Sequence, residues 1–244
     1  MGVGNESVAH PSPGVAPVPA QIRDRREVMN HMKRTMGHAF AALAFGAVLA
    51  LPSPAPASAD TSGGGANNVV TVLNTSGTML RGHAEIGFFG GDNTQSSNVA
   101  TALSHDCTGC HSRAVAVQEV VLTGSPSSVS PTNAATAVNS ACEGCDTVAY
   151  AYQNVFWSTN GASLAPGARQ QAAELTARIA VVAADDSVSD VPFVDSDGRV
   201  HSDLTDALDA LARQLDLVVE QGLVATGTTI VSNEAHRQVR AGAA

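Results

Sequence analysis

Apolar and polar positions along this chain follow two different periods. Between segments 114–120 and 149–155, the identical residues fall at every second position; they are Ala114, Ala116, Gln118 and Val120 in the first segment and Ala149, Ala151, Gln153 and Val155 in the second. A helix would place the matches three and four positions apart, whereas period two is typical of a β-strand. We therefore predict a strand in each segment. The intervening positions are also largely apolar, which indicates burial on both faces.

These two strands belong to a larger unit that occurs twice, 35 residues apart. Asn98 to Leu122 and Asn133 to Trp157 share the skeleton N-x-A-T-A-x4-C-x-G-C-x3-A-x-A-x-Q-x-V. A duplicated unit of this kind indicates a core that is built by repetition. The shared amides Asn98, Asn133, Gln118 and Gln153 are expected to be structural, because amides in apolar segments usually satisfy backbone groups.

The segment ahead of each cysteine pair has apolar residues at helical spacing. Ser97 and Thr132 stand where N-caps would lie, and the apolar positions are Val99, Ala102 and Leu103 in one copy and Ala134, Ala137 and Val138 in the other. Pro131 also suits a helix entry. Each unit is thus predicted to be a short helix, a C-x-G-C turn and a strand.

The remaining elements flank the duplicated units. Val69 to Leu73 and His83 to Phe89 are predicted to form a hairpin around the turn residues 74–77. Apolar stripes predict two helices, Pro166 to Ala184 and His201 to Glu220, the second with Ser202 as N-cap and Gly222 beyond its end.

Together these elements predict an α+β fold. An N-terminal hairpin and two helix/C-x-G-C/strand repeats (98–122 and 133–157) would form a sheet, with the two C-terminal amphipathic helices packed on it. The single domain is expected at 69–225, between a flexible leader at 60–68 and a tail at 226–244 without a clear pattern.

The first 59 residues have the parts of a secretory signal. Lys33 and Arg34 form a basic region, 39–51 an apolar run, and Ala57-Ser58-Ala59 a small-residue cleavage site. Thirteen apolar residues are fewer than the roughly 20 that a membrane-spanning helix needs. We expect removal of residues 1–59, which would comprise an upstream extension plus the signal peptide, and a secreted product without stable membrane insertion.

The negative net charge of the chain bears on which classes of molecule it can bind. The whole chain has a formal net charge of −9, and from Asp60 onward it contains eight Arg, no Lys and 19 acidic residues, a net charge near −11. Nucleic acids and anionic lipids attract basic surfaces. We therefore expect no nucleic-acid partner, and instead an extracellular or cell-wall partner whose identity the sequence does not specify.

The four cysteines, Cys107, Cys110, Cys142 and Cys145, are the strongest chemical signal. Export favours disulfides. A bond within each pair fits a unit that was duplicated whole, and Gly109 and Gly144 permit the tight turn. A bond across the repeats closes a longer loop and gives more stabilisation in the chain-entropy model. Both connectivities stay open, with pairing within each unit preferred.

Three other chemistries use the same cysteines. Paired C-x-x-C knuckles can hold structural zinc, although such sites are mostly intracellular. C-x-x-C is also the spacing of thiol-disulfide oxidoreductases. Finally, Cys107, Cys110 and His111 match the C-x-x-C-H attachment motif of c-type haem. The second copy has Asp146 in place of His111, so the histidine is not part of the repeated unit.

The segment from Cys142 to Gln153, with the pattern C-x-x-C-x-T-x-A-x-A-x-Q, resembles a loosely described group of exported proteins of high-GC Gram-positive bacteria. The similarity covers Asn98 to Trp157, and the first copy departs from it at Arg113. No activity is established for that group. The resemblance therefore implies the duplicated unit and export, and nothing about a substrate.

No hydrolase elbow, zinc-protease helix or phosphate loop occurs in the sequence. We expect no catalytic residues and no cofactor. The leading hypothesis is a secreted, disulfide-stabilised binding or cell-surface interaction protein without catalysis. The alternatives are an extracytoplasmic thiol-disulfide oxidoreductase and a c-type haem electron carrier.

Overall fold

A computed structural model describes residues 67–91, 93–124 and 128–242. The predicted signal peptide and most of the leader lie outside these residues. The described elements are β1 (Asn67–Asn74), β2 (Thr78–Gly90), β3 (Asn93–His105), β4 (His111–Thr123), β5 (Ser128–Ser140), β6 (Asp146–Ser158), α2 (Pro166–Ala184), β7 (Phe193–Val194), β8 (Val200–His201), α3 (Asp203–Ala225) and β9 (Ile230–Ala241). The architecture is mixed α+β, as predicted.

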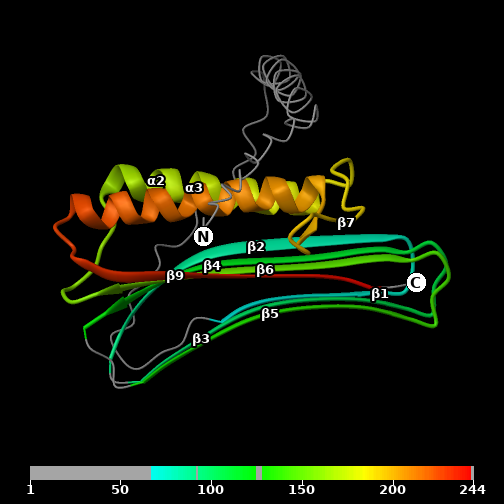
Figure 1. The fold of residues 1–244 in the computed structure, drawn as a ribbon, viewed down its shortest axis with the longest axis horizontal. Helices are drawn as coiled ribbons and strands as arrows, with labels where there is room; N and C mark the ends of the chain where they lie inside the picture. Colours follow the sequence, from blue (N-terminus) through cyan, green and yellow to red (C-terminus); the bar gives the residue numbers. More distant parts are fainter. Residues whose placement is uncertain (1–66, 92, 125–127, 243–244) are drawn as a thin grey trace, which may run out of the picture. The chain divides into compact units, whose positions relative to one another are not determined.

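The first six strands wind into a parallel β-solenoid of three coils. Strands β1, β3 and β5 form one parallel sheet, here called sheet A, and β2, β4 and β6 run parallel in a second, sheet B. The chain crosses from one sheet to the other after every strand, so that each coil contributes one strand to each sheet (Figure 1). Strand β9 joins sheet B antiparallel to β6.

The second and third coils stack in register at an offset of 35 residues. Asn98 pairs with Asn133 in sheet A, and Ala114 pairs with Ala149 in sheet B. The strands predicted after the two cysteine pairs are confirmed as β4 and β6. Every second side chain of these strands points toward sheet A, and this is the face that is shared between the repeats.

The helices predicted ahead of the cysteines are wrong. Those segments are β3 and β5, and Ser97 and Thr132 pair across two strands instead of capping helices. Alanine favours helices in isolation, but here Ala100 and Ala102 fill the space between two sheets, and tertiary packing overrides propensity. Pro131 is tolerated because β5 is the edge strand of sheet A.

The predicted N-terminal hairpin is also wrong. Its two segments are the strands β1 and β2, but they lie in different sheets. The turn residues 74–77 are there as expected, and Gly77 has a φ of +70°. The turn passes from one sheet to the other, because each strand finds its hydrogen-bond partner in the next coil instead of in its sequence neighbour.

Small side chains bring the two sheets close together near the cysteine turns. The buried apolar residues between the sheets here are two valines and seven alanines, namely Val70, Val72, Ala100, Ala102, Ala114, Ala116, Ala135, Ala149 and Ala151. Toward the other end of the coils, larger residues such as Val120, Leu122 and Val155 fill the core. The shared face of the repeat is therefore small because a second backbone packs on it.

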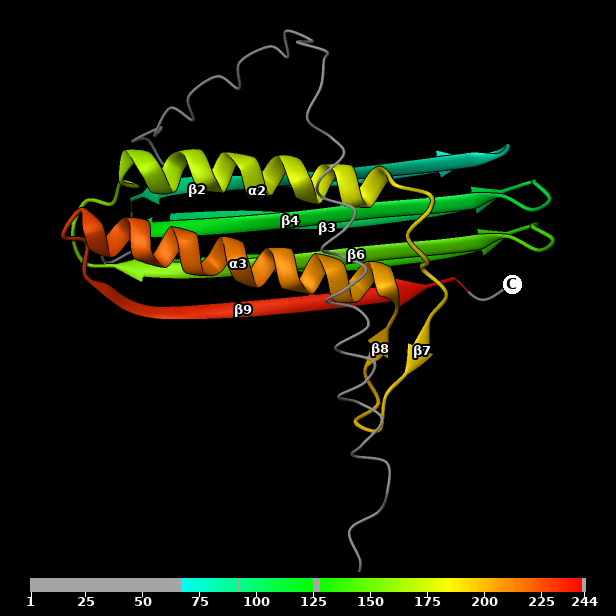
Figure 2. The same cartoon turned by 90° about the horizontal axis from the view of Figure 1, so that it is seen from above.

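Helices α2 and α3 cover the opposite face of sheet B (Figures 1 and 2). The bounds predicted for α2 are confirmed. Helix α3 begins after its predicted N-cap, Ser202, whose hydroxyl accepts from the Thr205 amide. It continues past Gly222, which was expected beyond its end. A Cβ at Gly222 would collide with Ala168 and Leu164, so this glycine permits close packing against the start of α2.

The segment expected to be a tail forms strand β9, which pairs with β6 along most of its length. Nearly all of its side chains are exposed or half-buried, and Val239 alone is buried within it. A polar edge strand of this kind has no hydrophobic alternation. It therefore left no signal in the sequence.

Two ladders of amides run through the core from coil to coil. Asn68 Nδ2 donates to Asn98 Oδ1 at 2.9 Å, and Asn98 Nδ2 donates to Asn133 Oδ1 at 2.7 Å. In the opposite direction, Gln153 Nε2 donates to Gln118 Oε1 and Gln118 Nε2 donates to Glu85 Oε1, both at 2.7 Å. The four amides singled out in the sequence all take part in these ladders.

Loss of the central amide should destabilise the solenoid strongly. Asn98 is fully buried, and its Nδ2 also lies within hydrogen-bond distance of the carbonyl oxygens of Ala116 and Tyr152. We expect Asn98→Ala to lower the free energy of unfolding by about 3 kcal/mol, because several buried partners lose their bonds. Urea unfolding measures the change. Gln95→Ala, on the exposed face of the same strand, should change it by less than about 0.5 kcal/mol; equal losses would contradict the ladder's role.

Candidate functional site

The structure brings all four predicted cysteines together at one end of the solenoid. Cys107 and Cys110 lie in the turn from β3 to β4, and Cys142 and Cys145 lie in the equivalent turn from β5 to β6. Each pair forms a local disulfide. Because the coils stack in register, the two disulfides are neighbours.

Backbone hydrogen bonds fix the two cysteine turns against each other. Gly109 N donates to Glu143 O at 2.8 Å, and Glu143 N donates to Cys107 O at 3.1 Å. Gly109 and Gly144 both have a φ of +64°, in the left-handed region that favours glycine. The two C-x-G-C motifs therefore adopt the same turn geometry.

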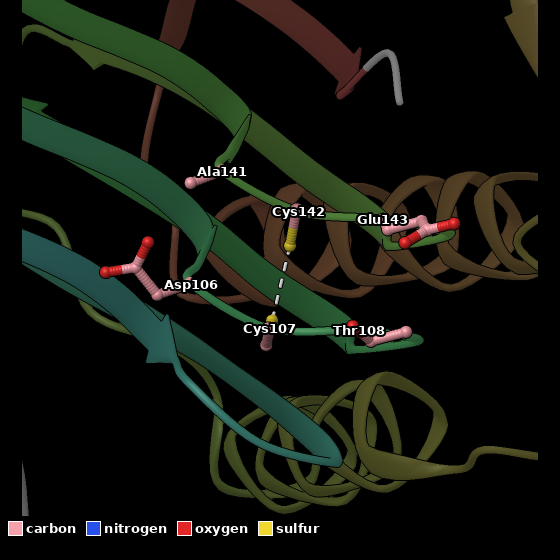
Figure 3. Close-up of a pocket in the computed structure, with 6 residues that line it drawn as sticks. All are labelled: Asp106, Cys107, Thr108, Ala141, Cys142 and Glu143. Carbon is pink, nitrogen blue, oxygen red and sulfur yellow. Dashed lines mark hydrogen bonds between the residues drawn. The ribbon is translucent and has the colours of Figure 1, made fainter.

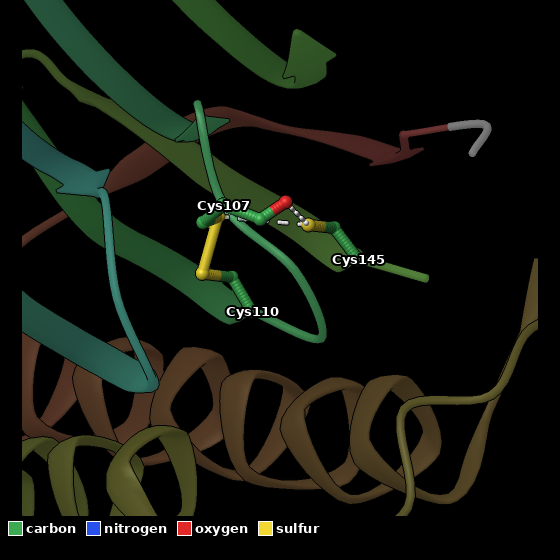
Figure 4. A group of neighbouring side chains, drawn as sticks. All are labelled: Cys107, Cys110 and Cys145. Atoms are coloured by element: carbon green, nitrogen blue, oxygen red, sulfur yellow. Dashed lines mark hydrogen bonds between the residues drawn. A yellow bond between two sulfur atoms is a disulfide. The ribbon is translucent and has the colours of Figure 1, made fainter. Parts of the chain in front are cut away.

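The sulfur atoms of neighbouring coils approach closely. Cys107 Sγ lies 3.2 Å from Cys142 Sγ and 3.6 Å from Cys145 Sγ (Figures 3 and 4). Cys107 and Cys142 are half-buried, whereas Cys110 and Cys145 are buried. The half-buried pair borders an open pocket of about 510 Å³, whose other lining residues are Asp106, Thr108, Ala141 and Glu143.

This arrangement bears on the zinc alternative. The sulfurs of Cys107, Cys110 and Cys145 all lie within 4.8 Å of one another, and Cys142 is 3.2 Å from Cys107. Three of these sulfurs are therefore close enough to share one metal ion, whereas Cys142 does not belong to that group and would have to move to complete a tetrahedral zinc site. Such a site needs both disulfides to be open, since only thiolates coordinate the metal.

The haem alternative finds no support in the geometry, because His111 is engaged elsewhere. Its Nδ1 lies 2.8 Å from Asp186 Oδ1, and its Nε2 lies 2.7 Å from Asp190 Oδ2. Neither ring nitrogen is available for an iron atom while these contacts hold. His111 and Asp146 pair across β4 and β6, so the residue that interrupts the repeat lies at the edge of a carboxylate cluster.

Arg113 is the centre of that cluster. Its side chain is fully buried, and its Nη2 donates to Asp190 Oδ2 at 2.9 Å. The guanidinium also donates to the carbonyl oxygens of Ala183, Asp185 and Val188. Because Ala183 lies in the last turn of α2, Arg113 supplies the positive charge that a helix C-terminus favours. It thereby anchors the segment between α2 and β7 to sheet B.

The cluster shifts the pKa values of its members. Burial alone would raise the pKa of Asp190, but hydrogen bonds from His111 and Arg113 outweigh it and lower the pKa to about 2. The hydrogen bond to Asp190 raises the pKa of His111, despite partial burial. Burial, and then the nearby Asp190 carboxylate, raise the pKa of Asp146. His111, Asp146 and Asp190 could hold a metal ion, but Arg113 and His111 already balance the Asp190 charge.

The sequence did not point to Glu119, which occupies a second buried acidic position. Glu119 lies on the helix-facing side of β4, where it pairs with Asn154 of β6, and it is fully buried. Neither of its carboxylate oxygens has a hydrogen-bond partner among the described residues. Burial, together with the nearby Asp216 carboxylate of α3, raises the pKa of Glu119 well above its usual range. The sequence did contain an indication of this site. Positions 119 and 154 are equivalent in the two repeats, and both are polar although the face of the strand on which they lie is otherwise apolar.

Comparison with protein-family models, with curated proteins and with solved structures found no match for this chain. Among the described residues, neither helix is long and apolar enough to cross a membrane. The functional argument therefore depends on the geometry of the site and of the surfaces around it.

The Arg113–Asp190 pair should be essential to the docking of the helical layer. Asp190→Asn leaves the fully buried Arg113 without its countercharge, and we expect the free energy of unfolding to fall by about 3 kcal/mol. Asp186→Asn is the matched control: the Asp186 side chain is 63% exposed, so its loss should cost less than about 1 kcal/mol. Urea unfolding of both variants at pH 6 makes the comparison, and equal costs would show that the buried pair is not special.

Glu119→Gln should stabilise the protein, and more so as the pH rises. The raised pKa means that folding favours the protonated carboxyl, so native stability is full below the usual carboxyl range and is lost as the pH rises through the folded-state pKa. Glutamine mimics the protonated form at every pH. We expect a gain in the free energy of unfolding at pH 8 that is almost absent at pH 4. Glu174→Gln, at an exposed position of α2, should show no such pH dependence; a destabilised Glu119→Gln variant at pH 8 would contradict this account.

Proposed function

We propose that the protein is exported and acts outside the cytoplasm as an interaction module without catalysis. The local disulfides of the two turns support this proposal, because structural disulfides belong to oxidising compartments. The signal-like segment 1–59 supports it from the sequence. The interaction surface that we propose is the outer face of sheet A.

That surface is free of charged side chains in a strongly acidic protein. Strands β1, β3 and β5 contain no Asp, Glu, Lys or Arg. Their outward side chains form rows across the coils, with a central row of threonines between two mainly aliphatic rows: Thr71, Thr101 and Thr136 in the centre, Val69, Val99 and Ala134 on one side, and Leu73, Leu103 and Val138 on the other. We call this surface the threonine face.

Several aliphatic side chains of the threonine face are exposed to solvent. Val69 and Leu73 are 57% and 56% exposed, respectively. The helices cover sheet B, and no described helix covers sheet A (Figure 1). A contiguous apolar patch on a protein surface is often an interaction site.

The partner that we propose is a second copy of the same face. With a net charge near −11 in the mature chain, two copies repel each other wherever their carboxylates meet. Contact between two threonine faces keeps those carboxylates apart and lets the aliphatic rows pack as in sheet-on-sheet structures. Three strands offer roughly 500 Å² per copy at ordinary strand spacing. That area is at the lower limit for a specific interface, so the association should be weak and concentration-dependent.

Sedimentation equilibrium of the exported, processed protein tests the proposal. We expect a mass that rises from one chain toward two with concentration, and a mature N-terminus at Asp60. Thr101→Glu, at the centre of the face, should keep the protein monomeric, because it brings like charges together in the dimer. Gln214→Glu adds the same charge on the exposed side of α3 and should associate like the parent. A parent that stays monomeric throughout, or equal effects of the two variants, would contradict the threonine face.

A thiol-disulfide oxidoreductase is the second candidate function. The observation that favours it is the open pocket beside the half-buried Cys107 and Cys142. This function requires the disulfides to exchange readily with glutathione at neutral pH. The interaction module requires only that they hold the turns, so slow exchange with glutathione separates the two functions.

A further inference from the structure

We infer that the two C-x-G-C pairs form one exchange-coupled centre, in which a thiolate at Cys107 attacks the disulfide of the next coil. The inference goes beyond the proposed interaction function and does not depend on it. It concerns electron transfer inside this chain, between two disulfides that the sequence alone presents as separate.

The distances between the sulfurs place the attacking atom within reach of the neighbouring disulfide. Cys107 Sγ lies 3.2 Å from Cys142 Sγ and 3.6 Å from Cys145 Sγ. Reacting atoms in productive complexes are about 3 to 3.5 Å apart and aligned with the bond that breaks. Cys107 Sγ is nearly as close to Cys145 as to Cys142 and so lies beside their bond; once its own disulfide is open, its side chain has to rotate into line before it attacks. Figure 4 shows Cys145 beside the Cys107–Cys110 disulfide, so the nucleophile and its target come from adjacent turns.

The backbone holds these distances without help from the sulfurs. The hydrogen bonds of Gly109 and Glu143 fix one turn on the other, and Asp146 N donates to Cys110 O at 2.8 Å. Strands β3 and β5, and β4 and β6, continue the same register on both sides of the turns. A thiol produced in one turn therefore meets the neighbouring disulfide at a high effective concentration.

Two of the four cysteines are accessible to a small thiol from solvent. Cys107 and Cys142 border the pocket (Figure 3). Cys110 and Cys145 are only 1% and 5% exposed. A small thiol from solvent reaches Cys107 or Cys142 first. Its attack on Cys107 forms a mixed disulfide and releases the Cys110 thiolate. A second molecule of the small thiol then attacks the sulfur of the first small-thiol molecule in that mixed disulfide, and Cys107 is freed as a thiolate.

The internal step balances without any further reactant. The small thiols leave as their own disulfide, and Cys107 and Cys110 are left as thiols. The Cys107 thiolate then bonds to Cys142 Sγ while the Cys142–Cys145 bond breaks, and the Cys145 thiolate takes up a proton. The Cys110 thiolate next attacks Cys107, and Cys142 leaves. The first disulfide is restored, and two electrons and two protons have moved one coil along.

Two serine variants test the internal attack. Cys110→Ser leaves Cys107 as a free thiol beside the intact Cys142–Cys145 disulfide. Cys107→Ser leaves the buried Cys110 instead, whose sulfur lies within 4.8 Å of Cys145 but is not in the same group as Cys142, the sulfur that Cys107 attacks. Both variants keep three cysteines, and far-ultraviolet circular dichroism checks that both are folded. Folded protein is incubated at pH 8 with a chelator, alkylated, denatured and digested.

Trypsin gives the readout directly. The chain contains no Lys after Lys33, and cleavage at Arg81, Arg113 and Arg169 places each cysteine pair on its own peptide, 82–113 and 114–169. A disulfide between the coils links these peptides, whereas a local one does not. We expect about tenfold more linked peptide in Cys110→Ser than in Cys107→Ser, as proximity of the attacking sulfur requires, and alkylation of Cys145 in addition to Cys107.

Two results would overturn the inference. One is Cys110→Ser protein labelled at Cys107 alone, with no linked peptide; the other is equal linkage in both variants, which would show scrambling without positional preference. The parent protein gives an independent check, because partial reduction with dithiothreitol should produce linked peptide in the folded state. If the fully reduced parent resists alkylation until a chelator is added, metal coordination replaces exchange as the chemistry of these thiols.

Discussion

In-register parallel stacking of the coils is the constraint on which the rest of the structure depends. Each residue of β4 lies beside its counterpart 35 positions later in β6, and β3 and β5 follow the same rule. A slip of one residue would turn every inward side chain outward. It would also separate Asn98 from Asn133 and Gln118 from Gln153, whose side-chain amides bond to one another only in this register. The same register places the two disulfides side by side.

In each amide ladder the hydrogen bonds all run in one direction from donor to acceptor, and the residues at the ends of a ladder differ chemically from those within it. The glutamine ladder passes its donors from Gln153 to Gln118 and ends on Glu85, a carboxylate that can accept but not donate when ionised. The asparagine ladder runs the other way and begins at Asn68, whose Oδ1 lies 2.9 Å from His83 Nδ1. At the third coil, β9 closes sheet B with an antiparallel strand. Among the described coils, the first and the last therefore differ from the middle one in the groups that terminate the amide ladders and sheet B.

The sequence predicted the elements whose pattern is decided locally. Strands β4 and β6 were evident from period two, and the bounds of α2 followed from its apolar stripe. Strands β3 and β5 were mistaken for helices because alanine is a good helix former, and its use here depends on a second sheet that local pattern cannot show. Strand β9 was missed because an exposed edge strand needs no apolar alternation. The clustering of the cysteines could be predicted only once parallel stacking was known.

Departures from the repeat indicate where the helical layer is attached. His111 and Arg113 replace Asp146 and Val148 of the next coil, and both side chains contact Asp190 in the segment that follows α2. Cys110 directly precedes His111, so the first disulfide fixes the start of the strand from which this ion pair reaches the helices. The repeat explains why the turns are alike, and the two departures explain why the strand after the first turn supplies the positive charge that pairs with Asp190. A rearrangement of bonds at Cys110 therefore acts next to the Arg113–Asp190 pair that holds the segment after α2 on sheet B, and one at Cys145 acts next to Asp146, which lies in the same cluster.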